Sequence, residues 1–297
     1  MSSIPRGTWI GYACLAVTAA GWALNWPFMK ILLREWPPLS ARGLAGVVAA
    51  LILAALAAGR GQSLRVPRPL WPRLLFAAFT NVFAWMGLGT MAMKFIPVGE
   101  AALVIYTMPI WTMLLAWPLL GEAPRLRDIL AIALGTAGVA LLLGGSGWQF
   151  DAGRLTGLGL SLATALLFAL GNVLNRTPLA DPLAILPPLT SVAWQVGLGC
   201  SAMLGLGLLF EKPDIAALSS TGLACLAYMT LVPMAVCYLT WFETLRRLPP
   251  VAASTGMLLV PILAIVAAAA VLGEPLGLRE AAAIALTLGG VAMALRR

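Results

Sequence analysis

Ten stretches of this sequence run for at least 15 residues without a single Asp, Glu, Lys or Arg. A transmembrane helix needs about 20 mostly apolar residues, with a range of about 17–25. Membrane β-strands would be about 10 residues long and would alternate in polarity, unlike these stretches. The stretches cover residues 7–29, 43–59, 74–93, 101–121, 129–150, 155–175, 182–210, 215–242, 248–273 and 281–295. The sequence therefore predicts an all-α integral membrane protein with ten transmembrane helices.

The composition excludes a water-soluble protein. Hydrophobic residues make up 61% of the chain and charged residues only 10%, whereas soluble proteins carry about 25% charged residues. Ten helices leave about 10 residues for each connection, so we expect no soluble domain. The first stretch is long and lacks a small-residue cleavage site, which favours a permanent span over a signal peptide.

Lys and Arg are distributed unequally between the two sets of connections. If successive stretches cross the membrane in alternate directions, one side holds twelve of the 19 basic residues and both chain ends. The other side holds the remaining seven, Lys30, Arg34, Arg42, Lys94, Arg154, Lys212 and Arg279. Cytoplasmic loops carry the basic excess, so we expect a bacterial inner-membrane protein with both termini in the cytoplasm. The net charge of +8 reflects this bias, and no nucleic-acid partner is expected.

A shift of 152 residues aligns the second half of the chain with the first. The aligned pairs are Lys94 with Arg246, Pro97 with Pro249, Pro109 with Pro261, Gly121-Glu122 with Gly273-Glu274, Arg127 with Arg279, Asp128 with Glu280, and Gly138 with Gly290. Each half holds five predicted spans, and this odd number means that the second half enters the membrane from the opposite side. Inverted repeats of this kind form many secondary transporters. We therefore expect repeats over residues 1–148 and 149–297, which surround a central cavity and rock to give alternating access.

Both halves carry one pattern of prolines, glycines and glutamates. It comprises Lys94-Phe-Ile-Pro97, Ala101-Ala102, Pro109, Gly121-Glu122, Gly135 and Gly138, and returns at Arg246, Pro249, Pro261, Gly273-Glu274 and Gly290. With Trp22-x-x-Asn25 in the first span, the pattern resembles the EamA modules of the drug/metabolite transporter superfamily. Size and aromatic content are most similar to the amino-acid exporters of the YddG type. The resemblance implies a cavity walled by spans 1, 3, 4, 6, 8 and 9, with spans 5 and 10 peripheral.

Aromatic and amide side chains occur inside the spans that the resemblance places around the cavity. Several are spaced i, i+4 or i, i+3, so that they share one helix face. The candidate substrate-binding residues are Trp22, Asn25, Asn81, Trp85, Tyr106, Phe168, Asn172, Tyr238 and Trp241. Asn and Tyr also form hydrogen bonds between membrane helices in the absence of any substrate. Helix–helix contacts are therefore the alternative role for these residues.

Three prolines, Pro27, Pro109 and Pro261, lie within or at the edge of predicted spans. Each removes a backbone donor and frees a carbonyl group one turn earlier. They are candidate hinges for the rocking motion, or sources of backbone groups for a zwitterionic substrate. Tolerated kinks are the alternative.

Ionisable residues are absent from the centres of the spans. Such residues mark substrate and proton pathways in membrane proteins. Glu243 lies closest to a span interior, and we interpret it as paired with Arg246 and Arg247 near the cytoplasmic end. Glu122 and Glu274 are assigned to helix capping or to pairing with nearby arginines. The cavity is therefore expected to hold no fixed charge.

An uncharged cavity lined by aromatic rings favours an exporter of aromatic and other neutral amino acids, and the resemblance supplies the direction of transport. A broad-specificity metabolite or drug exporter is the alternative. The sequence contains no His and offers no acidic residue at membrane depth, so we expect no catalytic residues, metal site or enzyme activity.

No cofactor is expected, and the expected partners are amino acids and membrane lipids. The four cysteines are interpreted as small buried hydrophobes. A stripe of small residues in the last span, Ala281, Ala285 and Gly289, suits helix packing or dimerisation. The sequence leaves open whether the protein is a monomer or a homodimer, and whether transport is coupled to protons.

Overall fold

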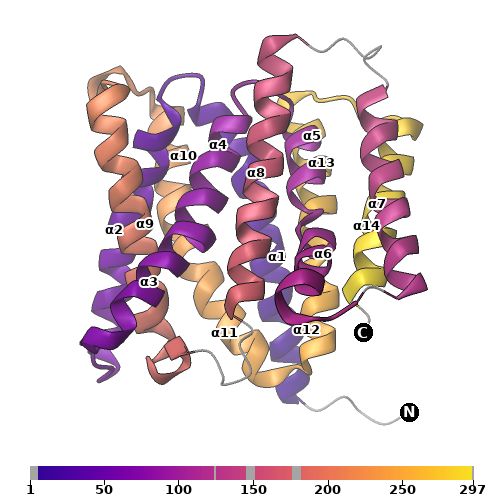
Figure 1. Cartoon of the computed structure of the whole chain (residues 1–297). Helices are drawn as coiled ribbons and strands as arrows, with labels where there is room; N and C mark the ends of the chain where they lie inside the picture. Colours follow the sequence, from indigo (N-terminus) through magenta and orange to yellow (C-terminus); the bar gives the residue numbers. More distant parts are fainter. Residues whose placement is uncertain (1–5, 124, 145–150, 176–181, 296–297) are drawn as a thin grey trace.

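In the computed structural model, which describes residues 6–123, 125–144, 151–175 and 182–295, all regular structure is helical (Figure 1). The predicted boundary between residues 148 and 149 lies outside these ranges. The α-helices are α1 (Arg6–Leu32), α2 (Pro38–Gly59), α3 (Trp71–Ala77), α4 (Gly89–Ala92), α5 (Val98–Ile105), α6 (Met108–Leu120), α7 (Leu126–Gly144), α8 (Ala152–Asn175), α9 (Pro188–Phe210), α10 (Ser220–Leu231), α11 (Cys237–Arg247), α12 (Pro250–Met257), α13 (Leu259–Leu272) and α14 (Leu278–Leu295). Short 3₁₀ turns are η1 (Arg68–Leu70), η3 (Pro182–Ile185) and η4 (Ile215–Ala217), and η2 (Ala78–Leu88) and η5 (Val232–Val236) are π-helical.

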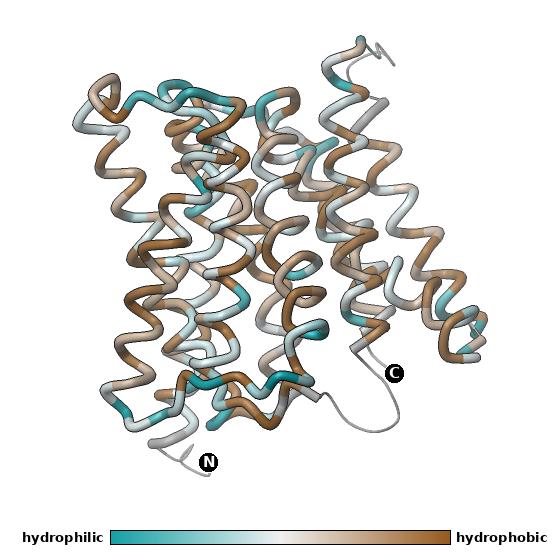
Figure 2. Tube along the Cα trace, turned by 60° about the vertical axis from the view of Figure 1, so that its left-hand side comes forward, coloured by the Kyte–Doolittle hydropathy of each residue, from teal (hydrophilic) through white to brown (hydrophobic). Residues whose placement is uncertain are grey.

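Six helical stretches within the described ranges are long and apolar enough to cross a membrane. They are Pro38–Gly59, Arg68–Ala92, Val98–Leu120, Ala152–Leu174, Pro188–Phe210 and Ser220–Arg247. Hydrophilic residues gather near the two ends of the bundle, whereas its flanks are mostly hydrophobic (Figure 2). Large apolar side chains such as Leu209 and Phe210 are exposed, as expected where lipid rather than water is the solvent. The prediction of an all-α membrane protein is confirmed.

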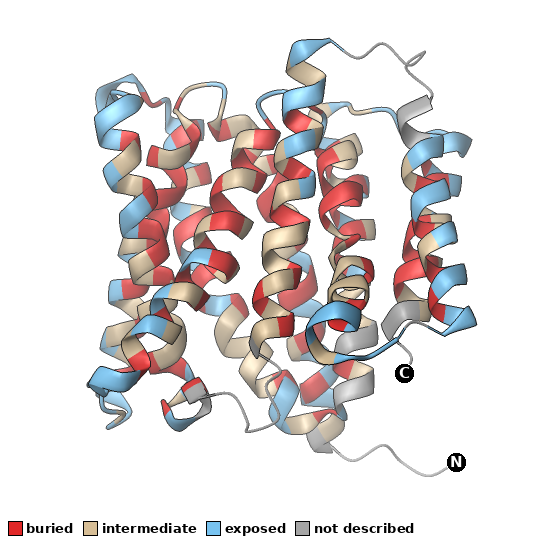
Figure 3. Ribbon diagram, viewed as in Figure 1, coloured by how far each residue is buried: buried red, intermediate tan, exposed pale blue. Residues whose placement is uncertain are grey.

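Buried residues concentrate on the parts of the helices that face one another (Figure 3), and the largest buried cluster contains many residues of α1. Ala19, Ala23 and Met29 of α1 are each at most 1% exposed. The two alanines allow close approach of neighbouring helices, and α1 packs against α10, α11 and α13. The second large cluster joins α2, η2 and α9. The two clusters together surround the cavity described below.

Two spans are interrupted shortly before the aligned prolines. The first break separates α5 from α6 at Tyr106 and Thr107, and Pro109 follows in the first turn of α6. The second break separates α12 from α13 at Leu258, and Pro261 follows within α13. A proline cannot donate to the carbonyl four residues earlier, so the helix is weakened there. Pro27 instead lies inside the continuous helix α1. The hinge function of the three prolines stays a prediction.

The π-helical segments were not predicted from the sequence. The segment η2 replaces most of one span between α3 and α4, and η5 separates α10 from α11. Segments of this kind are rare and occur frequently at functional sites, because the wider turn re-aims the side chains that follow. Both segments contribute residues to the cavity.

The helices α7 and α14 lie side by side, apart from most of the bundle in Figure 1, and pack closely through small residues. A Cβ atom added at Gly138 would lie 2.7 Å from the carbonyl oxygen of Ala283, and one added at Gly290 would lie 2.5 Å from the carbonyl oxygen of Ala131. The predicted role of Ala281, Ala285 and Gly289 in packing within the chain is wrong, and their alternative role in dimerisation stays a prediction. Ala281 and Ala285 are exposed, and Gly289 has open space around it, because the buried face of α14 lies on nearly the opposite side of the helix, at Ala283, Thr287 and Gly290.

Acidic side chains cap several helices where spans meet. Glu274, after α13, accepts hydrogen bonds from the backbone N–H groups of Val98 and Gly99 at the start of α5, at 2.8 and 3.0 Å. Glu211, after α9, does the same for Leu39 and Ser40 at the start of α2. These carboxylates satisfy N–H groups that a helix start leaves unpaired. The predicted capping role of Glu274 is confirmed, but Arg279 pairs with Glu280 instead.

Candidate functional site

A cavity of about 400 Å³ lies between the helices. Drug-sized ligands occupy sites of about 300–1,000 Å³, so this cavity suits a small metabolite. Its walls come from α1, α2, η2, α4, α6, α8, α9, η5, α11 and α12 and from the short segments that adjoin them. The lining residues are Trp22, Asn25, Trp26, Arg42, Asn81, Val82, Trp85, Met86, Gly89, Thr90, Met93, Tyr106, Met108, Phe168, Asn172, Val192, Gln195, Val196, Pro233, Met234, Tyr238 and Met257. The wall is wider than the resemblance implied, because α2 and α9 also contribute.

Eight of the nine predicted binding residues line this cavity. They are Trp22, Asn25, Asn81, Trp85, Tyr106, Phe168, Asn172 and Tyr238. Trp241 is not among the lining residues, and its ring contacts that of Trp22, at 6.0 Å between centroids. The sequence pattern therefore identified residues that share one cavity. That they bind a substrate stays a prediction.

One wall of the cavity is a chain of aromatic rings. The ring of Trp85 lies 4.8 Å from that of Phe168 and 6.0 Å from that of Tyr106, and Tyr106 lies 6.1 Å from Trp26. Centroid separations of about 4.5–7 Å are favourable for aromatic pairs. These rings come from α1, η2, the break before α6, and α8. They form a continuous apolar surface, with neighbouring rings tilted or edge-on to one another, that can pack against an aromatic or aliphatic group.

Amide and indole groups are held in fixed orientations around the cavity. Asn81 Nδ2 donates to Gln195 Oε1 at 3.2 Å, and Gln195 Nε2 donates in turn to the Ser191 hydroxyl. The indole N–H of Trp22 donates to the carbonyl oxygen of Pro233, at 2.9 Å, and so ties α1 to the π-helical segment η5. An amide oxygen has two lone pairs, so one that accepts a single hydrogen bond can accept another from a ligand.

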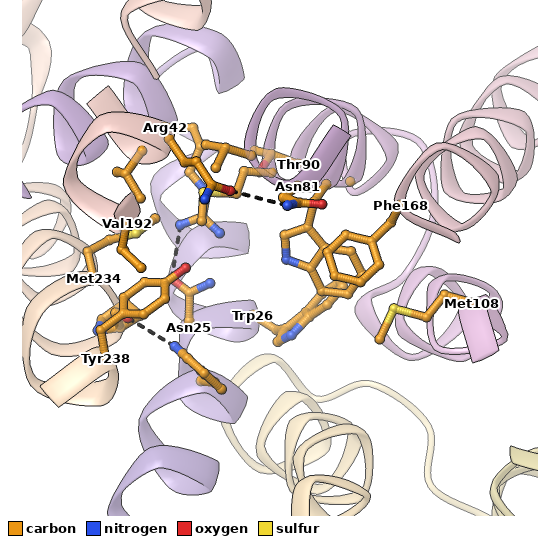
Figure 4. A pocket seen from close by; sticks show the side chains of 18 of the residues that line it. Asn25, Trp26, Arg42, Asn81, Thr90, Met108, Phe168, Val192, Met234 and Tyr238 are labelled. Atoms are coloured by element: carbon orange, nitrogen blue, oxygen red, sulfur yellow. Dashed lines mark hydrogen bonds between the residues drawn. The ribbon is translucent and has the colours of Figure 1, made fainter. Parts of the chain in front are cut away.

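The expectation of an uncharged cavity is wrong, because Arg42 lines it. This side chain is 7% exposed, and its Nη1 donates to Asn25 Oδ1 at 3.3 Å. Figure 4 shows its head group directed toward Asn25 and Tyr238. Arg42 bounds a charge-free stretch in the sequence, which predicts a place at the end of a connection. The helix in fact begins at Pro38, so Arg42 lies in its second turn.

A signal for this placement was present in the sequence. Proline is favoured in the first turn of a helix, and Pro37-Pro38 precedes Arg42 by one turn. A helix start assigned from the prolines would have placed Arg42 within the span. Gln195 and five lining methionines lacked any such signal, because their position on the cavity depends on tertiary packing.

Glu243 and Lys30, two other charged residues near the ends of spans, lie outside the cavity wall. Glu243 pairs with Arg246 at 2.7 Å and with Arg247, as interpreted from the sequence. Lys30, at the end of α1, donates to the carbonyl oxygens of Met93 and Ile96. Within the described ranges, no group of three or more Cys, Asp or Glu side chains has the geometry to hold a metal ion.

Comparisons with known proteins place this architecture among membrane transporters. The sequence model of the EamA-like transporter family matches residues 9–144 and 155–296. Over 94% of this chain and 89% of the relative, it is 26% identical to the uncharacterized transporter YvbV of Bacillus subtilis. It is 28% identical to a probable amino-acid metabolite efflux pump of Salmonella typhimurium, over 94% and 92%. It is 29% identical to the aromatic amino acid exporter YddG of Ancylobacter novellus, over 82% of each chain.

Proposed function

The chain belongs to the EamA-like transporter family, and we propose that it exports aromatic and other neutral amino acids across the bacterial inner membrane. Membership of a transporter family implies solute transport rather than catalysis. The observation that carries the proposed substrate is the aromatic wall of the cavity, in which Trp85 contacts both Phe168 and Tyr106. A ring or an aliphatic side chain buried against this wall would gain the usual free energy of apolar burial.

The relatives support the same substrate class. One is named as a probable amino-acid metabolite efflux pump and another as an aromatic amino acid exporter. A broad-specificity metabolite or drug exporter is the second candidate. It is favoured by the five methionines in the wall, Met86, Met93, Met108, Met234 and Met257, because methionine side chains adapt to ligands of different shape.

The proposed mechanism is alternating access between two inverted five-helix repeats, over residues 1–148 and 149–297, in a bundle of ten spans. Features separated by 152 residues support it. The breaks before Pro109 and Pro261 are related in this way. So are two caps, in which Asp128 accepts from the Arg125 N–H and Glu280 accepts from the Gly277 N–H. Such pseudo-symmetry would give the outward-open and inward-open states similar energies.

The proposed orientation places both termini in the cytoplasm. The basic residues support it, since twelve of 19 fall on the side that holds the termini. The arrangement of the helices is compatible with it, because α1 begins and α14 ends at the same end of the bundle (Figure 1).

The test is counterflow of radiolabelled Trp, Phe, Thr, Met, Lys and Glu in liposomes that contain the purified protein, with and without a pH gradient. We expect saturable movement of the neutral and aromatic amino acids. The Asn172→Trp variant, which fills the cavity from α8, should abolish this movement. The Gly159→Trp variant is the matched control, because Gly159 lies on the exposed side of the same helix with open space around it.

Two other results would overturn the proposal. Movement of none of the amino acids, in liposomes where a known carrier works, would exclude the proposed substrate class and favour the metabolite or drug alternative. Equal movement in wild type and Asn172→Trp would place transport outside this cavity.

A further inference from the structure

The guanidinium group of Arg42 is buried in the cavity without a matching negative charge. The side chain is 7% exposed, and none of the described residues that line the cavity is acidic. Arg42 takes part in none of the ion pairs of the described residues. Its Nε is fully buried and has no hydrogen-bond partner. The guanidinium group of Arg42 therefore has an unpaired positive charge and an N–H donor without an acceptor.

Burying a guanidinium group costs free energy unless an anion pairs with it. Arginine side chains stay protonated in proteins, so Arg42 cannot give up its proton to escape the cost. Inside a membrane, charged residues of this kind usually mark a pathway for a substrate. The neighbours of Arg42 are neutral: Asn25 accepts one hydrogen bond, and Tyr238 lies beside the head group (Figure 4). They orient the guanidinium and leave its charge uncompensated.

The rest of the cavity indicates which anion fits. Figure 4 shows Arg42, Asn25 and Tyr238 together at one side, with Phe168 and Met108 across the cavity. A ligand that spans these two sides has a negative head group and an apolar, preferably aromatic, body. The planar fork of a guanidinium matches a carboxylate, to which it can donate two parallel hydrogen bonds.

We propose that Arg42 is the carboxylate-binding residue of the cavity, and that the protein recognises the carboxylate of its substrate rather than the amino group. The inference rests on the proposed function and refines its substrate class. Because the described wall offers no carboxylate to an ammonium group, an aromatic monocarboxylate without an amino group is also a ligand. It neutralises Arg42 without bringing a second charge into the cavity. Organic amines that lack a carboxylate are excluded by the repulsion between two cations.

The test compares ligands that differ only in charge at the head group. Phenylpropanoate and phenylpropanamide have the same ring and nearly the same shape, and phenylalanine and phenylalaninamide form a second pair. Binding to the detergent-purified full-length protein is measured by isothermal titration calorimetry. We expect each carboxylate to bind at least about tenfold more tightly than its amide, as a charge-assisted bidentate contact requires.

Variants of Arg42 then assign this discrimination to its guanidinium. In Arg42→Gln, the two members of each ligand pair should bind within about twofold of one another, because the charge-assisted contact is lost. Arg42→Lys should retain part of the preference, since it keeps the charge and loses the fork. The matched control is Arg65→Gln, which removes an exposed arginine from a connection. If Arg42→Gln fails to fold, equal binding of acid and amide to wild type still overturns the proposal, and a reduced preference in Arg42→Lys assigns it to the guanidinium.

The outcomes separate this inference from the proposed function. Equal binding of phenylpropanoate and phenylpropanamide to wild type would overturn the role of Arg42, even if phenylalanine is transported in liposomes. An unchanged preference in a folded Arg42→Gln variant would overturn it as well. Tight binding of phenylpropanoate that depends on Arg42, without transport of any amino acid, would support the inference and exclude the proposed amino-acid substrates.

Discussion

The side-chain oxygen of Asn25, on α1, accepts a hydrogen bond from Nη1 of Arg42, on α2, at 3.3 Å. Because Asn25 is neutral, this bond orients the guanidinium and leaves its charge available. The variant Asn25→Asp replaces the amide by a carboxylate of almost the same shape, which would pair with Arg42. We expect binding of phenylpropanoate to weaken by at least about tenfold, since the internal carboxylate competes with that of the ligand. Calorimetric titration of the purified variant measures this loss.

The control for this prediction is Asn25→Leu, which removes the hydrogen bond without adding a charge. It should weaken binding less than Asn25→Asp does. Undiminished binding of phenylpropanoate to Asn25→Asp would contradict a role for Arg42 in carboxylate recognition.

The cap that Glu274 forms on α5 is predicted to contribute to stability. In Glu274→Ala, the N–H groups of Val98 and Gly99 lose their acceptor. The expected cost is about 1–2 kcal/mol in the free energy of unfolding, as for the loss of other N-terminal caps. Denaturant unfolding in detergent micelles provides the measurement. Glu243→Ala is the comparison, because exposed ion pairs within one helix contribute little. A larger loss for Glu243→Ala than for Glu274→Ala would refute this assignment.

Two adjacent glycines in α14 are predicted to respond in opposite ways to the same substitution. A Cβ at Gly290 would lie 2.5 Å from the carbonyl oxygen of Ala131 in α7, whereas Gly289 has open space around it. Gly290→Ala should therefore destabilise the protein by about 1–3 kcal/mol through overpacking. Gly289→Ala should be neutral or stabilising by up to about 1 kcal/mol, because alanine favours helix formation. Equal unfolding free energies for the two variants would be inconsistent with the close packing of α7 and α14.

The contact between Glu35 and Ser219 is predicted to make stability depend on pH. Glu35 follows α1, and its carboxylate accepts hydrogen bonds from the Ser219 hydroxyl at 2.7 Å and from the Ser219 N–H at 2.8 Å. The hydroxyl contact first, and then the backbone contact, lowers the pKa of Glu35 below its ordinary value of 4.5. A lowered pKa in the folded state means that the contact stabilises the protein above the unfolded pKa. This contribution disappears as the pH falls through the folded pKa.

The expected result is a higher unfolding temperature for wild type than for Glu35→Gln at neutral pH. The difference between the two should shrink as the pH falls below 4.5. Thermal unfolding in detergent over a series of buffers gives both values. A difference that stays constant down to about pH 3 would show that the charge of Glu35 is irrelevant to the contact.

Much of the helical architecture could be predicted, because lipid leaves few alternatives to a helix for a long apolar stretch. The charge-free stretch 43–59 corresponds to most of α2, but the first residues of this helix, before residue 43, were not predicted to belong to the span. A boundary drawn at a charged residue fails when that charge lies inside the helix, as Arg42 does. The π-helical segments η2 and η5 were not predicted either, since their apolar sequences also suit an α-helix.

The candidate site was predictable where spacing along a helix is informative. Asn81 and Trp85, four residues apart in the sequence, both line the cavity, as do Phe168 and Asn172. The pattern could not reveal Gln195, because its partner Asn81 lies on a helix more than a hundred residues earlier. Trp241 was predicted to line the cavity, but it is not among the lining residues and instead contacts Trp22. Tyr238, three residues earlier on the same helix, does line the cavity, so a shared helix face did not place both side chains on the wall.

The contact between α7 and α14 has a consequence for the ancestry of the chain. Gly138 meets Ala283 and Thr287, and Gly290 meets Ala131 and Gly135. Gly290 lies 152 positions after Gly138, and Ala283 and Thr287 lie 152 positions after Ala131 and Gly135. A surface of this kind is self-complementary. Two copies of one of the proposed five-helix repeats, inserted in opposite directions, could have docked through it. Duplication and fusion of the gene would then have joined two subunits that already recognised one another, and later substitutions such as Arg42 could arise in one half alone.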